Sequence, residues 1–89
     1  MKKIVTVTEI AGEGMESLLG KNVMIFCLNY IYTGKLSGVN ESCLVLEGAR
    51  IVYETGAFST KSFTDAQALP FNLYVQLSAI ESFSETDKT

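Results

Sequence analysis

The sequence contains no histidine and only two cysteines, and these absences remove several classes of chemistry. Histidine is the usual acid–base catalyst near neutral pH and the commonest metal ligand. Without it, Cys27 and Cys43 cannot supply the four ligands of a typical zinc site within one chain. We therefore expect neither a metal nor another cofactor. Both cysteines lie in apolar, strand-like runs, which favours free buried thiols in a reducing compartment.

Motifs for catalysis are also missing. The acidic residues show no spacing that would pair two carboxylates for acid–base chemistry. The glycines at 12 and 14 do not form a nucleotide loop, because neither a Gly-Lys-Ser/Thr sequence nor a second glycine set follows them. We predict that the protein is not an enzyme.

Long apolar runs and an excess of basic charge are absent as well. No stretch of about 18 uncharged apolar residues and no signal-peptide pattern occurs, so we expect a cytoplasmic protein with no membrane contact. The net charge of −3 disfavours a broad surface that tracks phosphates. Yet 47% of the 89 residues are hydrophobic, more than so small a domain needs for its own core. We expect the excess to lie in subunit contacts.

The first quarter of the chain combines a weak strand pattern with a helical one. Alternating valine and threonine within residues 1–12 predict either a strand or an ordered arm that lies on the domain or on a neighbour. Met15, Leu18 and Leu19 have helical spacing and Gly20 follows them, which predicts a short helix near residues 13–19.

From residue 21 onward the pattern is typical of strands. An apolar run over 23–28 and a run over 31–39 predict two strands, and Gly34 and Gly38 allow the second to bend or to approach another backbone closely. Residues 43–54 predict a third strand, with a bulge or bend at Gly48.

The last third of the chain contains a long connection, two short strands and a tail. Residues 55–72 predict a connection that is functional, self-packed or part of an interface. Strands are expected at 73–77 and 80–83, with a corner at 78–79 between them. We expect the tail at 85–89 to be disordered.

These patterns together predict one mainly β domain over residues 1–89 with its core at about 13–84. Its expected architecture is a short N-terminal helix followed by a strongly bent five-stranded antiparallel small barrel.

Two short motifs in this region resemble those of the Sm-like (LSm) family, and especially its bacterial Hfq branch. The first motif has apolar residues in the first strand, a Gly-x-hydrophobic step at Gly34 and Leu36, and a third strand over 44–47. The second is the sequence YVQLSAIESF at 74–83. The apolar positions of the first strand that match are Val23, Ile25 and Cys27, and those of the second motif are Ala79, Ile80 and Phe83.

The resemblance implies a closed ring in which the fourth strand of one subunit pairs with the fifth strand of the next. Apolar strands at the edges of an open sheet are stable only when they are paired or covered. Head-to-tail pairing with a closing rotation covers every edge, and we expect roughly five to seven subunits. The expected interface residues are Leu73, Val75, Leu77, Ile80 and Phe83.

The resemblance also implies a uridine pocket, although its stacking and basic residues are replaced in this chain. The acidic position of the family is Asn40, the stacking position is Ser42, and the basic pair falls on Leu77 and Ser78. Phe26 falls where the Hfq branch often has an aromatic residue on a second RNA-binding face, and the alternative interpretation is that it packs under the helix or a neighbour. Four tyrosines could stack on bases or simply pack in strands and interfaces. They are Tyr30, Tyr32, Tyr53 and Tyr74.

Three hypotheses follow from the sequence. The first is a homo-oligomeric Sm-like ring that binds single-stranded RNA through a degenerate pocket or another surface. The second is a ring that serves as a protein-interaction or assembly module without nucleic-acid binding and contacts other proteins through residues 55–72. The third is a small barrel of similar shape that stays monomeric.

Overall fold

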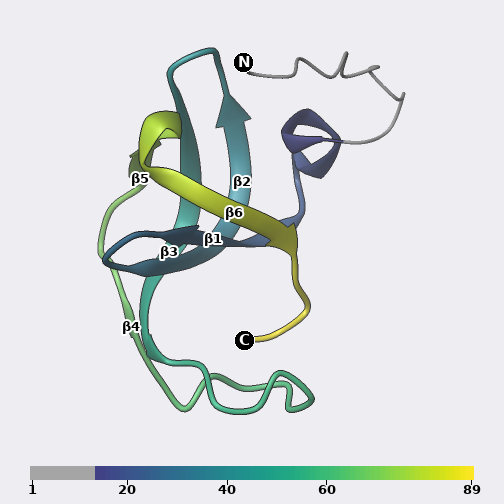
Figure 1. The fold of residues 1–89 in the computed structure, drawn as a ribbon, viewed down its shortest axis with the longest axis vertical. Coiled ribbons are helices and arrows are strands. Elements are labelled where there is room, and N and C mark those ends of the chain that lie inside the picture. The colour runs from purple at the N-terminus through teal and green to yellow at the C-terminus, as the bar shows by residue number, and fades with distance from the viewer. Residues whose placement is uncertain (1–13) are drawn as a thin grey trace, which may run out of the picture.

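The structure is a computed structural model that describes residues 14–89, so the expected arm over residues 1–12 lies outside the described part. The chain is mainly β, as predicted (Figure 1). Its elements in order are the 3-10 turn η1 (Met15–Leu18), β1 (Asn22–Cys27), β2 (Ile31–Val39), β3 (Cys43–Glu54), β4 (Asp65–Ala68), β5 (Leu73–Gln76), the 3-10 turn η2 (Leu77–Ala79) and β6 (Ile80–Glu85).

The helix expected near residues 13–19 is one 3-10 turn, η1, within the described residues, so this prediction is wrong in extent. Gly14 stands at its N-cap and no side chain caps the turn. The chain leaves the helical conformation at Leu19, which has ψ 131°, and Gly20 follows in a left-handed conformation with φ +84°. Met15 and Leu18 still pack against the core, as the apolar spacing predicts.

The strands form one antiparallel sheet that is not closed. Its order is β4-β3-β2-β1-β6, and β5 pairs with β3 beside this path. Figure 1 shows β1 and β6 crossing the long hairpin of β2 and β3, so the sheet is strongly bent, as expected. The bend coincides with Gly34, where two residues of β3 oppose one residue of β2. Gly48 lies at the same place with φ +60° and confirms the expected irregularity of the third strand.

Residues 14–89 contain six strands instead of the five expected. The additional strand is β4, which precedes the fourth predicted strand, β5, and pairs with the same strand, β3. β5 pairs with β3 up to Leu46↔Leu73, and β4 pairs with β3 from Arg50↔Ala68 onward. The Leu69 N–H donates to the Ala49 carbonyl at 2.8 Å, whereas Pro70 has no N–H to donate. The connection expected over 55–72 is therefore a loop at 55–64 followed by a strand.

Two apolar clusters lie on opposite sides of β1. The first fills the bend of the sheet and contains Val23, Ile25, Leu36, Leu44, Leu46, Ala49 and Val75. The second contains Met24, Val52 and Phe63. Successive residues of β1 alternate between the clusters because side chains of a strand point to alternate faces. Both faces of β1 are thus covered, which explains its continuous apolar run.

The tail expected to be disordered is ordered in the structure. β6 extends to Glu85, and the Thr86 N–H then donates to the Asn22 carbonyl at 2.9 Å. The Phe63 N–H donates to the Thr89 carbonyl at 2.7 Å. Residues 86–89 are therefore joined to both β1 and the 55–64 loop.

We expect Gly34→Ala to destabilise the fold by about 1–3 kcal/mol, the usual cost of overpacking. A Cβ atom at Gly34 would lie 3.0 Å from the Glu47 carbonyl oxygen and 3.2 Å from the Ala49 Cα. Both are backbone atoms of β3, which cannot withdraw without disturbing its pairing with β2. The free energy of unfolding in urea measures the effect.

Gly38→Ala is the matched control for this substitution. Its added Cβ would meet only the Val45 Cγ1, at 3.1 Å, and that side chain can shift. An equal loss of stability in the two variants would contradict the role assigned to the β3 backbone.

Candidate assembly edges and nucleic-acid cleft

β5 is one free edge of the sheet, because among the described residues it pairs only with β3. The Leu77 N–H donates to the Ser42 carbonyl at 2.9 Å, which fixes the direction of the alternating backbone groups. In an antiparallel pair, residues that bond to the partner alternate with residues whose N–H and C=O point away. The outward groups of β5 therefore belong to Tyr74 and Gln76.

β6 is a second free edge, because among residues 14–89 it pairs only with β1. The hydrogen bond from the Thr86 N–H to the Asn22 carbonyl extends this pairing. By the same alternation, Phe83 and Glu85 direct their N–H and C=O groups away from β1. Each edge therefore has two alternate residues whose backbone N–H and C=O groups both point away from the sheet.

The structure places four of the five predicted interface residues in or against the first apolar cluster. Val75 is a buried member of this cluster, and Leu73, Leu77 and Ile80 are half-buried against it. Phe83 keeps 39% of its surface exposed. A charged residue at Val75 would therefore unfold the domain itself and would not report on an interface. Phe83 and the outward backbone groups are the accessible features of the edges.

Three of the four residues predicted for a uridine pocket line one surface cleft. Ser42, Leu77 and Ser78 come together where the turn between β2 and β3 meets η2. Asn40 is not among the residues that line the cleft. Its Oδ1 accepts hydrogen bonds from the N–H groups of Ser42 and Cys43, at 2.8 and 2.9 Å, and so holds the turn.

Phe26 does not join this cleft. It packs against the second apolar cluster, beside Met24, Val52 and Phe63, and is half-buried there. Phe26 thus packs within the domain, but not under η1, because Met15 and Leu18 of that turn pack against the first apolar cluster.

Tyr74 is an aromatic residue of the cleft that the sequence names only as one of four tyrosines. It is 72% exposed and lines the cleft together with Ser42 and Ser78. The signal that distinguishes it is the alternation along β5, where Val75 is buried and its neighbour must point to the other face. Its exposed ring is the aromatic surface of this cleft, where Ser42 offers none.

The cleft carries one carboxylate, that of Glu41, and no cation. The basic residues of the described chain lie elsewhere and most of them have partners. Lys21 and Lys61 form exposed ion pairs with Glu85 and Asp87, at 3.8 and 3.7 Å. Arg50 is half-buried, with its Cζ 5.7 Å from the centroid of the Phe63 ring. Nothing in this cleft attracts a phosphate by charge.

A second groove lies beside the turn between β1 and β2. Tyr30, Tyr32 and Tyr74 line it, and the ring centroids of Tyr30 and Tyr32 are 6.0 Å apart. Burial raises the pKa of the Cys27 thiol in this groove, and the Glu81 carboxylate raises it further. Burial is also the main cause that raises the pKa of Tyr32. Both groups are therefore held in their protonated forms near neutral pH, which does not favour a reactive thiolate.

Two further searches cover residues 14–89. No helix in this part of the chain is long and apolar enough to cross a membrane. Within the same residues, no group of three or more cysteine or acidic side chains is arranged to hold a metal ion. Cys27 and Cys43 are free, as predicted, but half-buried rather than buried.

Comparison of the chain with protein families, with characterised proteins and with solved structures finds no match. The class defined by the fold is that of a small, mainly β domain built on one open antiparallel sheet.

Proposed function

We propose that the chain is an Sm-like small barrel that assembles with copies of itself into a closed ring and acts as an assembly module. The observation that carries the proposal is the presence of two free strand edges with matching outward groups, on β5 and β6. An exposed edge invites pairing with another chain unless it is covered. β4 and β6 end the main path of the sheet, and β5 continues the line of β4.

Head-to-tail pairing follows because the two edges belong to different strands. When β5 of one copy pairs with β6 of the next, the growing chain keeps one free edge at each end until the last copy meets the first. A ring satisfies every edge, whereas an open chain leaves two. Phe83 and Tyr74 would lose exposed apolar surface in this pairing, which adds a favourable hydrophobic contribution.

Native mass spectrometry of the protein as purified tests the proposal. We expect a single homo-oligomeric stoichiometry, roughly five to seven subunits, over a range of micromolar concentrations. A monomer at all concentrations would exclude the ring. A concentration-dependent ladder of sizes would indicate open chains instead.

Single-stranded RNA binding is the second candidate function, and the exposed Tyr74 in the cleft is the observation that favours it. Base stacking on an aromatic side chain contributes about 1–3 kcal/mol and does not require a particular base. The uncharged and acidic lining of the cleft makes RNA the weaker candidate, because phosphate contacts normally supply much of the affinity. Short U-rich and A-rich oligonucleotides added to the same mass-spectrometry samples test it.

Where RNA binds, we expect Tyr74→Leu to lower the affinity about tenfold, the loss that corresponds to one stacked base. Tyr53→Leu is the matched control, because Tyr53 is 55% exposed and lies on β3, away from the cleft. Fluorescence anisotropy with a labelled oligonucleotide measures both variants, and native mass spectrometry checks that their stoichiometry is that of the parent. Equal losses in the two variants would remove the cleft as the RNA site.

A further inference from the structure

Lys88 is almost completely buried, at 5% exposure, although lysine is rarely buried without a partner. Its ammonium group donates three hydrogen bonds. The Ala57 carbonyl accepts at 2.9 Å, the Thr60 carbonyl at 2.6 Å and the Thr60 Oγ1 at 2.9 Å. An ammonium group has three donors, so all of its hydrogen-bonding capacity is used.

The charge of Lys88 is held without a carboxylate. The ion pairs within residues 14–89 involve Lys21 and Lys61, and neither includes Lys88. Instead, the Lys88 Nζ lies 5.5 Å from the centroid of the Phe63 ring, within the range of a cation–π interaction. Neutral oxygens combined with an aromatic ring are the surroundings that recognise ammonium ligands, because the ring quadrupole and the carbonyl dipoles direct negative potential at the cation.

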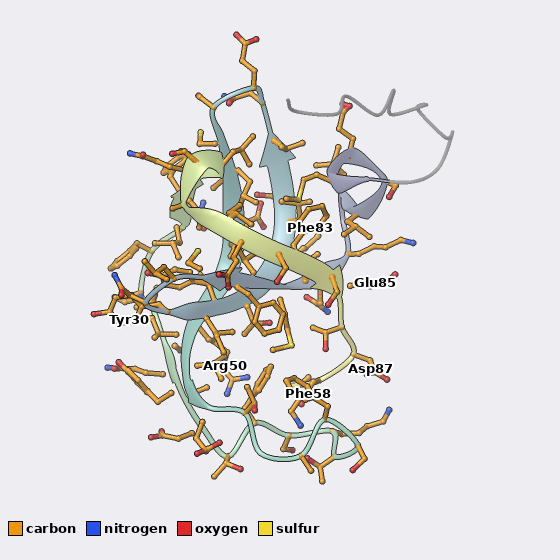
Figure 2. All side chains as sticks on the ribbon, viewed as in Figure 1. Tyr30, Arg50, Phe58, Phe83, Glu85 and Asp87 are labelled. Carbon is orange, nitrogen blue, oxygen red and sulfur yellow. The ribbon has the colours of Figure 1, made fainter. Side chains whose placement is uncertain are left out.

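The backbone around Lys88 holds the segment in place on both sides. The Thr89 N–H donates to the Lys61 carbonyl at 2.6 Å, and the Phe63 N–H donates to the Thr89 carbonyl at 2.7 Å. The Lys88 N–H donates to the Thr86 Oγ1 at 3.0 Å. Figure 2 shows the segment descending from Glu85 past Asp87 toward the loop that carries Phe58.

The contacts of this segment also close the second apolar cluster. Phe63 is the only member of the buried set Met24, Val52 and Phe63 that comes from the 55–64 loop. The loop itself contains no strand within the described residues, so its position depends on these contacts. Fixing Lys88 therefore fixes Phe63 in the second apolar cluster on the sheet.

We infer that the loop at residues 57–63 is a binding site for a primary ammonium group, occupied in this chain by the side chain of Lys88. Residues 86–89 then form a strap that holds the loop over the second apolar cluster. The site is separate from the free edges of β5 and β6, so the inference does not depend on assembly.

Lys88→Met tests the strap, because methionine keeps most of the side-chain length and removes the charge. We expect amide hydrogen exchange at Phe63 and Thr89 to become faster by about tenfold or more, which corresponds to the loss of one charge-assisted hydrogen bond. Lys61→Met is the matched control, since its side chain is 83% exposed and its ion pair is on the surface. Unchanged exchange in Lys88→Met, or equal acceleration in the control, would overturn the inference.

Chemical rescue of Lys88→Ala tests the ligand class. The substitution removes the equivalent of n-propylammonium, so we expect n-propylammonium chloride to slow the exchange of the Phe63 amide again. 1-Propanol with sodium chloride at the same ionic strength is the control for an apolar cavity and for salt. Rescue by propanol alone, or no rescue by the amine, would show that the loop is not an ammonium site. If Lys88→Ala does not fold, amine-dependent recovery of folding is the readout, and its absence has the same meaning.

Discussion

Replacing Gln76 with proline is expected to convert the proposed oligomer into smaller species while the fold of the subunit is retained. Gln76 has φ −70°, which is the angle that the proline ring imposes. Its N–H points away from β3, so the substitution removes no hydrogen bond within the subunit. In the proposed ring it removes a donor from every interface and leaves the opposing carbonyl unpaired.

Leaving this carbonyl unpaired costs about 1–3 kcal/mol at each interface, which lowers the association constant of the interface roughly 5- to 150-fold. Because a closed ring lacks this hydrogen bond at every interface, we expect fewer subunits per particle at concentrations where the parent is fully assembled. Native mass spectrometry and light scattering after size exclusion measure the change. Far-UV circular dichroism and thermal unfolding check that the subunit is folded.

Gln76→Ala is the control that isolates the backbone donor. It removes the same side chain but keeps the N–H group, so we expect it to assemble as the parent does. A proline variant that keeps the mass of the parent would exclude pairing through this edge of β5. Dispersal by both variants would assign the effect to the side chain instead.

Replacing Leu46 with alanine is expected to cause a large loss of stability, about 2–5 kcal/mol, as for other fully buried leucines. Leu46 is completely buried in the first apolar cluster, and its partner in β5 is Leu73. The removed atoms leave a cavity that the paired strands β3 and β5 cannot close without losing their register. Since small domains have stabilities of about 5–15 kcal/mol, such a loss is a large share of the total.

Urea unfolding of Leu46→Ala in the Gln76→Pro background measures this effect without a contribution from assembly. Leu28→Ala is the matched control, because Leu28 is 84% exposed in the turn after β1. We expect the control to change stability by less than about 0.5 kcal/mol. Similar losses in both variants would contradict the position of Leu46 in the core.

The apolar residues of the described chain divide into a buried set and an exposed set. Both faces of β1 are covered within one subunit, so the continuous run from Val23 to Phe26 is used internally. Of the large exposed side chains, Tyr74 and Phe83 lie on the edge strands β5 and β6, and Leu28 and Tyr30 lie in the turn after β1. The others lie elsewhere and are Leu19, Tyr53, Phe58 and Phe71.

Several features could be predicted from the sequence because they depend on local spacing. Period-two alternation and the apolar run of β1 indicated strands at nearly the observed positions, and the glycines at 34 and 48 indicated the bend. The length of η1 could not be predicted with the same success. Met15, Leu18 and Leu19 have helical spacing, but the backbone is non-helical at Gly14 and again at Leu19, so only one 3-10 turn forms.

The candidate site could be predicted only in part. The positions of Ser42, Leu77 and Ser78 in one cleft agree with the sequence pattern, whereas Asn40 is used by a turn and Phe26 by the second cluster. The selection of Tyr74 among four tyrosines required the observed burial of its neighbour Val75. Residue type suggests which side chains can stack, but exposure depends on the register between β3 and β5.

The sequence by itself determined the class of this protein, because strand periodicity, glycine positions and the absence of histidine are properties of single positions and their neighbours. Only the tertiary structure decided which strand edges are free and that β4 and β5 pair in line with the same strand, β3. It also decided that the Lys88 ammonium group is buried against carbonyl and hydroxyl oxygens. These features depend on contacts between residues far apart in the chain, such as Lys88 with Ala57 and Thr60. No local pattern specifies such contacts, because they follow from how the sheet bends and where its last strand ends.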